Sequence, residues 1–243
     1  MNPLTDTTVS DGTVVLLAVV GSTAYGLAHE GSDEDHLGVY QAPTTAILGL
    51  HGASVMDTSH VRHEPDVALH EIGKYTRLAL KANPTVLELL WASHYYVTSE
   101  VGEELIALRR EFLATGPVRA AYAGYAVQQA HRLRERSEEG REGFKSRLRS
   151  RTAKHGRHCY RLLTMGRQLL ATGELTLDVS DIRERIFEVG ELAASDPHAF
   201  AALFERELAD FDATPSVLPE HPNVDAVEEF LVRARLRDLA TRS

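Results

Sequence analysis

Residues 13–41 read TVVLLAVVGSTAYGLAHEGSDEDHLGVYQ, and this stretch decides the fold. It opens on a continuous apolar run, residues 13–20, which is rich in β-branched side chains and too short for most helices. Such a run is typical of a buried strand. Gly21 ends the run, and residues 35–41 then alternate polar and apolar side chains, which predicts a second strand. The stretch therefore predicts two strands joined by a turn.

Paired acidic residues stand where the second strand begins. Asp33 and Asp35 are two positions apart, so the twofold period of a strand places both carboxylates on one face. Two like charges held side by side repel each other, and a bound divalent cation relieves that repulsion. Oxygen ligands suit Mg²⁺ or Mn²⁺. We therefore predict that Asp33 and Asp35 bind metal, whereas Glu34 points to the opposite face.

The Gly-Ser step before these acids has a different role. Gly21 lets the backbone turn sharply and approach a ligand closely, and Ser22 offers a backbone N–H and a hydroxyl to a phosphate. A Gly-Ser step alone is only a turn, and an Asp-x-Asp pair alone is usually a solvated loop. The segment lacks the later glutamate of an EF-hand and the Gly-Lys-Ser/Thr of a Walker loop. Phosphate donors beside metal-binding acids are what phosphoryl transfer needs.

The remainder of the chain changes from mixed to helical character. We predict further strands over 54–60 and 66–70, and then amphipathic helices over 100–114, 117–137, 146–171, 180–194, 197–211 and 224–240. The predicted fold class is α+β, with a short sheet and flanking helices followed by a helical bundle. The predicted organisation is a flexible start over 1–12, a catalytic domain over 13–115 and a helical domain over 116–243 that completes a nucleotide cleft.

Composition narrows the class of protein. The formal net charge of −9 argues against a wholly basic nucleic-acid binder, yet residues 131–161 carry eleven Lys and Arg against four Glu. Such a local basic surface suits a phosphorylated ligand. Cys159 is the only cysteine, so no internal disulfide can form and no disulfide-linked partner is expected. The chain shows no secretion signal and no membrane-length apolar run, which predicts a cytoplasmic protein without a membrane partner.

Longer matches indicate a family. The segments GSTAYGL, GSDEDHLGVY, DVALHE, KANPTVLELLW, KHGRHCYRLL and LLATGEL resemble a bacterial and phage family of predicted nucleotidyltransferases in the DNA-polymerase-beta superfamily, of the RNA-repair type. The resemblance covers about residues 14–175. It implies a polymerase-beta-like nucleotidyltransferase domain and a third carboxylate on a later strand, for which Asp66 is the best match, with Asp57 and Glu71 as substitutes. Asp33, Asp35 and Asp66 would then form a catalytic triad that holds two metal ions.

A basic helix is the second predicted site. Lys154, His158 and Arg161 have the spacing of one helical face and could bind the β- and γ-phosphates, with Arg161 able to bind two oxygens at once. The alternative is a solvated face or salt bridges to acidic residues. Arg149 and its neighbours Arg147 and Arg151 are expected to lie in solvent or to contact a nucleic-acid backbone.

These observations predict an enzyme that moves a nucleoside monophosphate from a nucleoside triphosphate to an acceptor hydroxyl, with release of pyrophosphate. Gly21 and Ser22 would bind the triphosphate with the basic helix, and Mg²⁺ or Mn²⁺ would be the cofactor. The acceptor could be an RNA end, a small molecule or a protein side chain. A third possibility is an inactive fold that binds nucleotide or another protein, which intact Asp33 and Asp35 disfavour.

Overall fold

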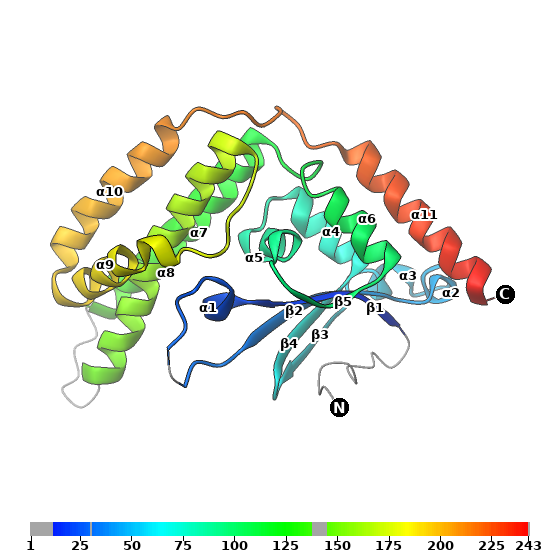
Figure 1. The fold of residues 1–243 in the computed structure, drawn as a ribbon, viewed down its shortest axis with the longest axis horizontal. Coiled ribbons are helices and arrows are strands. Elements are labelled where there is room, and N and C mark those ends of the chain that lie inside the picture. The colour runs from blue at the N-terminus through cyan, green and yellow to red at the C-terminus, as the bar shows by residue number, and fades with distance from the viewer. Residues whose placement is uncertain (1–11, 30, 138–144, 243) are drawn as a thin grey trace. The chain divides into compact units, whose positions relative to one another are not determined.

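The computed structural model describes residues 12–29, 31–137 and 145–242. The predicted flexible start, residues 1–12, lies outside the described residues except for Gly12. Two compact units make up the chain: unit 1 is Met1–Leu113 with His221–Ser243, and unit 2 is Ala114–Glu220. Each unit is described by itself below, with the element labels of Figure 1.

Unit 1 is built on a mixed sheet, as the sequence predicts. Within the described residues its five strands lie in the order β3-β4-β2-β1-β5. β2 and β4 are parallel, and the other neighbours are antiparallel. The strands are β1 (Thr13–Val20), β2 (Asp35–Gln41), β3 (Ser59–His63), β4 (Asp66–Glu71) and β5 (Tyr95–Thr98). The bounds of β1 and β2 are those predicted, because the apolar run of β1 is buried in the middle of the sheet.

Short helices surround this sheet. They are α1 (Gly21–Ala24), α2 (Thr44–Ile47), α3 (Gly52–Val55), α4 (Ile72–Leu80), α5 (Pro84–Glu88), the 3-10 helix η1 (Leu89–Trp91), α6 (Glu100–Ala107) and α11 (Val224–Arg242). Figure 1 shows α4, α5 and α6 on one side of the sheet. Asn83 begins α5 as its N-cap, with its side chain accepting a hydrogen bond from the Val86 N–H at 3.3 Å, and Pro84 follows in the first turn. The Asn-Pro step therefore begins this helix.

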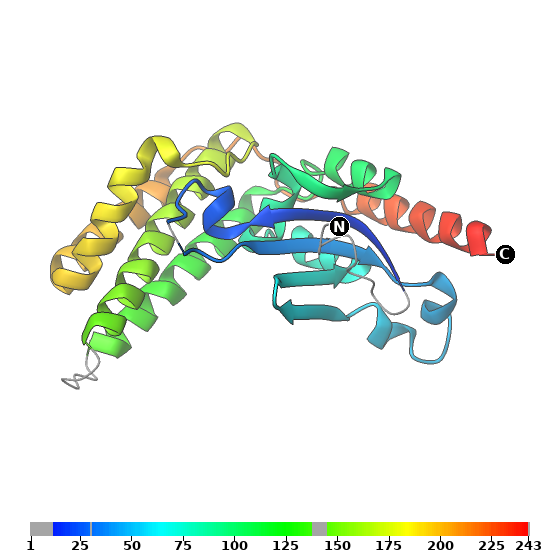
Figure 2. The same cartoon turned by 60° about the horizontal axis from the view of Figure 1, so that its bottom comes forward.

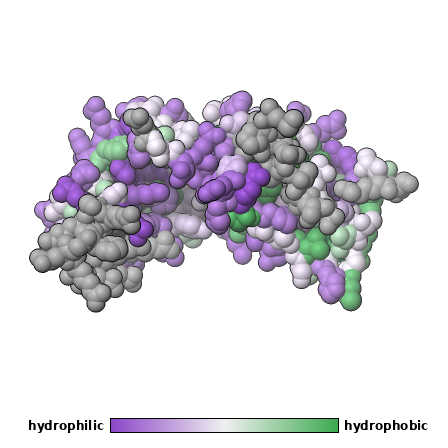
Figure 3. Space-filling model, turned by 90° about the horizontal axis from the view of Figure 1, so that it is seen from below, coloured by the Kyte–Doolittle hydropathy of each residue, from purple (hydrophilic) through white to green (hydrophobic). Residues whose placement is uncertain are grey.

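The prediction of a strand over 54–60 is wrong in its first half. Residues up to Val55 are helical, with the Met56 N–H donating to the Gly52 carbonyl at 3.0 Å, and β3 begins only at Ser59. Pairing with β4 sets this start, because Ser59 is the partner of His70. The surface view shows that hydrophobic residues, in green, are scattered among hydrophilic ones (Figure 3). Among the exposed large hydrophobic residues, Leu48 and Leu50 are 72% and 95% exposed. They lie beyond the C-terminal end of β2, away from the turn at Gly21.

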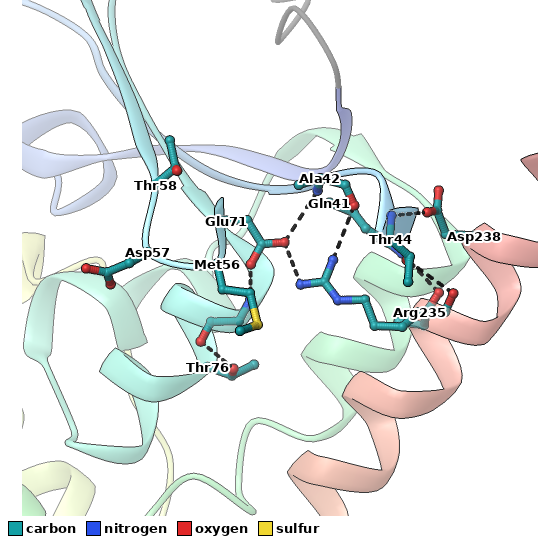
Figure 4. A network of polar contacts seen from close by, with 12 residues as sticks. Gln41, Ala42, Thr44, Met56, Asp57, Thr58, Glu71, Thr76, Arg235 and Asp238 are labelled. Atoms are coloured by element: carbon teal, nitrogen blue, oxygen red, sulfur yellow. Dashed lines mark hydrogen bonds and ion pairs between the residues drawn. The ribbon is translucent and has the colours of Figure 1, made fainter. Parts of the chain in front are cut away.

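The last helix belongs with the sheet rather than with the helical bundle. α11 packs against α2, α4 and α6, and polar contacts fix it to the end of β2 (Figure 4). The Gln41 side chain donates to the Ala234 carbonyl at 3.0 Å, and the Thr44 N–H donates to Asp238 at 2.7 Å. We predicted one helical domain over 116–243, whereas the structure groups residues from His221 onward with unit 1.

Unit 2 consists of packed helices. They are α7 (Thr115–Ser137), α8 (Lys145–Thr172), the 3-10 helix η2 (Ser180–Ile182), α9 (Arg183–Ser195) and α10 (Pro197–Ala213). α8 packs closely on α9, because glycines allow near contact: a Cβ on Gly156 would lie 2.5 Å from the Ala193 Cβ, and one on Gly190 would lie 2.8 Å from the Ala153 carbonyl. No helix within the described residues is both long enough and apolar enough to cross a membrane.

The reactivity of the single cysteine measures whether unit 2 is folded. Cys159 is completely buried on α8, its thiol donates to the Ala126 carbonyl at 3.4 Å, and burial raises its pKa to about 12. Because the thiolate is the reactive form, we expect a thiol reagent at mildly alkaline pH to react with native protein only as unit 2 opens. Denatured protein should react rapidly at one thiol per chain. Rapid stoichiometric labelling of the native protein would contradict this placement.

Candidate active site at the start of β2

The turn after β1 brings a glycine beside an acidic residue. Gly21 has a φ of +70° and is the first residue of α1, a single helical turn (Figure 2). The Tyr25 N–H donates to the Gly21 carbonyl at 3.1 Å, and the Leu27 N–H donates to the Ser22 carbonyl at 2.9 Å. Val20, the last residue of β1, pairs with Asp35, the first residue of β2. The turn is therefore fixed next to the Asp35 carboxylate.

The space between Gly21 and the Asp35 carboxylate is too small for a side chain at position 21. A Cβ added to Gly21 would lie 2.3 Å from Oδ2 of Asp35, so any side chain would displace the carboxylate. The positive φ independently favours glycine. Two separate constraints thus favour glycine at the turn for which the sequence predicts phosphate binding.

Substituting Gly21 by alanine tests this contact. We expect Gly21→Ala to displace Asp35 and to lower nucleotide binding at least roughly tenfold, because the strain of φ > 0, about 1–2 kcal/mol, is joined by the clash. Gly31→Ala is the matched control: Gly31 has a φ of +83°, but a Cβ there would meet nothing within 4 Å. Fluorescence titration with a labelled triphosphate compares the two variants. Equal losses in both would show that the clash with Asp35 has no functional consequence.

The predicted carboxylates lie at one end of the sheet. Asp35 begins β2 and is partly buried, Asp33 lies just before it and is exposed, and Asp66 begins β4 and is exposed. Strands β2 and β4 are parallel, with His36 paired to Val67, so Asp35 and Asp66 occupy corresponding positions on neighbouring strands. Such positions share a face and are about 4.8 Å apart in the direction of pairing.

The other candidates for the third carboxylate lie elsewhere. Asp57 precedes β3 and pairs with Arg77 at 3.2 Å. Glu71 ends β4, five residues beyond Asp66, which is about 16 Å along a strand. Its carboxylate is fully buried and accepts a hydrogen bond from the Gly73 N–H at 2.7 Å. The position of Asp66 therefore favours it over Asp57 and Glu71, and its catalytic role stays a prediction.

Residues on the opposite face of β2 support this end of the sheet. Glu34 lies 2.9 Å from Nε2 of His36, and the Tyr96 hydroxyl of β5 donates to Glu34 at 3.2 Å. His36 is buried, and its Nδ1 lies 3.2 Å from the backbone carbonyl of Asp66. We predicted Glu34 to point away from its neighbours, but not this link from β2 to Asp66. Nothing in the sequence signals it, since it depends on the register of β2 against β4.

A second unpredicted contact fixes the glycine turn. The hydroxyl of Tyr25, the residue that ends α1, donates to the carboxylate of Glu88. Glu88 is buried at the end of α5. Asn83 and Pro84 begin this helix, so the contact links the start and end of α5 to the turn after β1. The turn at Gly21 is therefore tied to α5 as well as to β2.

The donor set at this site suits a cation that also binds phosphate. Among the residues that the structure describes, no group of three His, Cys, Asp or Glu side chains is placed to hold a metal ion. Mg²⁺ in proteins commonly takes one or two carboxylates and completes its shell with water and substrate phosphates. Asp35 and Asp66 offer hard oxygen donors on adjacent strands. These residues fit a divalent ion that arrives with a triphosphate.

The predicted basic residues all lie on α8 in unit 2. Lys154 is exposed, whereas Arg161 is only 3% exposed. The Arg161 guanidinium donates to Sδ of Met165 at 2.9 Å and to Nδ1 of His158 at 3.2 Å. The structure thus brings His158 and Arg161 together, with the guanidinium directed to residues of its own helix. The binding of phosphate by these residues stays a prediction.

Comparison with known proteins identifies the family. None of the curated proteins matches the chain. A solved structure, titled as a nucleotidyltransferase-like protein from Exiguobacterium sibiricum 255-15, is 12% identical, with 95% of this chain and 73% of that chain covered and a TM-score of 0.29. Residues 4–233 match the family described as "RNA repair pathway DNA polymerase beta family". Because this match spans almost the whole chain, the protein belongs to the RNA repair pathway DNA polymerase beta family.

Proposed function

We propose that the protein is a Mg²⁺- or Mn²⁺-dependent nucleotidyltransferase that moves a nucleoside monophosphate from a nucleoside triphosphate to an acceptor hydroxyl. The observation that carries this proposal is the contact between Gly21 and Asp35, with Asp66 at the corresponding position of the next strand. A backbone that can approach phosphate closely is thereby placed beside oxygen donors for the cation that accompanies it. Membership of the family supports nucleotidyl transfer as the class of reaction.

Each residue of this site has a role in the proposed reaction. Asp33, Asp35 and Asp66 would hold two divalent cations, which would offset the charge of the phosphates. The backbone N–H groups and hydroxyl at Gly21 and Ser22 orient the triphosphate. The acceptor oxygen bonds to the α-phosphorus while the bond from that phosphorus to the bridging oxygen of the β-phosphate breaks, and pyrophosphate leaves. Asp66 would complete the metal site on the acceptor side and accept the proton of the attacking hydroxyl.

The acceptor we favour is an RNA end. The family description and the basic stretch that includes α8 support it. A small molecule or a protein side chain would use the same chemistry, because the site determines the donor and the reaction more than the acceptor.

A label-transfer experiment tests both the reaction and the acceptor. The protein is incubated with Mn²⁺ or Mg²⁺ and with triphosphates labelled on the α- or the γ-phosphate, in the presence of RNAs with different ends. We expect α-label, but not γ-label, on RNA together with release of pyrophosphate. Label on the protein or on a small molecule would move the proposal to those acceptors. Transfer of γ-label would contradict nucleotidyl transfer, and triphosphate binding without any transfer would indicate an inactive fold.

A further inference from the structure

Helix α8 is strongly basic in an acidic protein. It contains eight Lys and Arg residues and no Asp or Glu, while the whole chain has a formal net charge of −9. Like charges three or four positions apart on a helix are destabilising, and α8 has no acid of its own to offset them. Neighbouring helices offset part of this charge, through Arg149 with Glu191 and Arg167 with Glu207, and an anionic partner would add to that offset.

The next helix adds two arginines to this surface. Arg183 opens α9 and lies with its Cζ 4.8 Å from the centre of the Phe187 ring, and Arg157 of α8 lies 4.6 Å from the same ring. Arg185 lies 5.9 Å from the centre of the Tyr160 ring on α8. These contacts hold the charged groups of two helices around aromatic rings.

We name the arginine cluster as Arg149 and Arg157 of α8 with Arg183 and Arg185 of α9. Arg149 contacts Glu191 at 3.1 Å, and Arg185 contacts Glu188 at 3.2 Å. Burial lowers the pKa of Arg157, Glu191 raises it and the neighbouring Arg183 lowers it further. Arg157 and Arg183 share the Phe187 ring, at 4.6 and 4.8 Å from its centre, so their like charges lie near each other and a bound anion would relieve their repulsion.

The position of Arg157 is fixed by the packing of the helices. A Cβ on Gly190 of α9 would lie 2.6 Å from Cγ of Arg157, so the absence of a side chain there makes room for the arginine stem. The stem lies in the contact between the helices, and the guanidinium emerges over Phe187. An arginine held in this way loses little further conformational freedom when it binds a ligand.

We propose that the arginine cluster binds the phosphodiester backbone of a single-stranded nucleic acid. Arginine binds phosphate oxygens in pairs, and its planar group together with aromatic rings offers stacking surfaces for unpaired bases. Basic groups interleaved with aromatic rings are the combination found on surfaces that bind single strands. The inference rests on the proposed function only in that the bound strand would be the acceptor. Binding itself requires neither metal nor triphosphate.

Fluorescence anisotropy with a labelled oligouridylate, measured over a series of KCl concentrations, tests the proposal. The variant Arg157→Ala/Arg183→Ala should weaken binding at least roughly tenfold. The slope of log Kd against log salt should fall by about 1.4, since each phosphate contact on a single strand contributes about 0.7. The control Arg206→Ala/Arg233→Ala removes the same charge from exposed positions of α10 and α11, whose side chains are 64% and 52% exposed. This control should keep the slope of the wild type.

A second variant uses the two more exposed arginines of the cluster. The side chains of Arg149 and Arg185 are 60% and 45% exposed, so Arg149→Ala/Arg185→Ala should fold normally and still reduce the slope. The proposal is overturned if the wild type does not bind the oligomer at low salt, or if both cluster variants match the control. The cluster variants are also tested with a DNA oligomer of the same length. An equal loss of affinity for DNA and RNA would show that the cluster binds any single strand, and a larger loss for RNA would show that it prefers RNA.

The same variants separate this inference from the proposed function. Asp35→Asn should bind the oligomer as the wild type does, because the carboxylate belongs to unit 1 and the cluster to unit 2. Cluster-dependent binding without nucleotide transfer would keep the inference and contradict the proposed function. Nucleotide transfer to a small molecule or protein without any binding of the oligomer would support the proposed function and contradict the inference.

Discussion

Asp35→Asn should lower the rate of nucleotidyl transfer by at least roughly 10³-fold, since a metal ligand contributes several kcal/mol to transition-state stabilisation and each 1.4 kcal/mol is a factor of ten. Asparagine keeps the size and one oxygen but removes the charge that holds the cation. The contact of Gly21 with Oδ2 leaves no room for the new amide to turn freely. We therefore expect the loss mainly in kcat, measured as release of pyrophosphate under saturating triphosphate.

Glu34→Gln is the matched control for this variant. Glu34 stands between the two aspartates in the sequence, and its carboxylate contacts His36 and Tyr96. We expect less than a tenfold loss from Glu34→Gln, and thermal melts should show that both variants fold. Equal losses in Asp35→Asn and Glu34→Gln would contradict the assignment of the two faces of β2.

Arg235→Ala should destabilise unit 1 by about 3–5 kcal/mol, because it leaves a buried carboxylate without its charged partner. Glu71 is completely buried and lies 2.6 Å from the Arg235 guanidinium (Figure 4). Arg235 also donates to the Ala42 carbonyl at 3.3 Å and so joins the ends of β2 and β4 to α11. Trp91 is the only tryptophan and belongs to unit 1, so urea unfolding followed by its fluorescence measures this loss.

Arg233→Ala provides the comparison for that measurement. Arg233 lies on the same helix, is about half exposed and is 3.8 Å from both Glu104 and Glu229. Surface pairs of this kind contribute at most about 1 kcal/mol. The reactivity of Cys159 in unit 2 should change little in Arg235→Ala, which would localise the effect to unit 1. An unchanged unfolding midpoint for Arg235→Ala would show that α11 does not stabilise the sheet.

Local patterns predicted the elements that carry the site. The apolar run of β1 and the alternation of β2 predicted the bounds of both strands. This succeeded because the pattern of buried side chains within each segment is enough to indicate a central strand. β5 was not predicted, since Tyr95–Thr98 is four residues long and only partly buried. The pairing of β5 with β1 depends on the register of the sheet, which no local pattern shows.

Contacts between distant parts of the chain could not be predicted from local sequence patterns. Helix α11 was predicted, but not its place in unit 1, because its anchors lie more than 190 residues away in the sequence. Spacing placed Lys154, His158 and Arg161 on one helix, but it could not show that Arg161 is buried. At the sheet, the sequence predicted Asp33, Asp35 and Gly21 as a group, and the structure adds the direct contact between Gly21 and Asp35.

The proposed function requires the carboxylates beside Gly21 to bind a divalent cation together with a triphosphate. Electron paramagnetic resonance of free Mn²⁺, recorded with a non-hydrolysable triphosphate, measures this directly. We expect the wild-type protein with the nucleotide to lower the signal of free Mn²⁺ more than the nucleotide alone does. The variant Asp33→Asn/Asp35→Asn with the nucleotide should lower it no more than the nucleotide alone. Equal uptake by the wild type and the double variant would contradict the account.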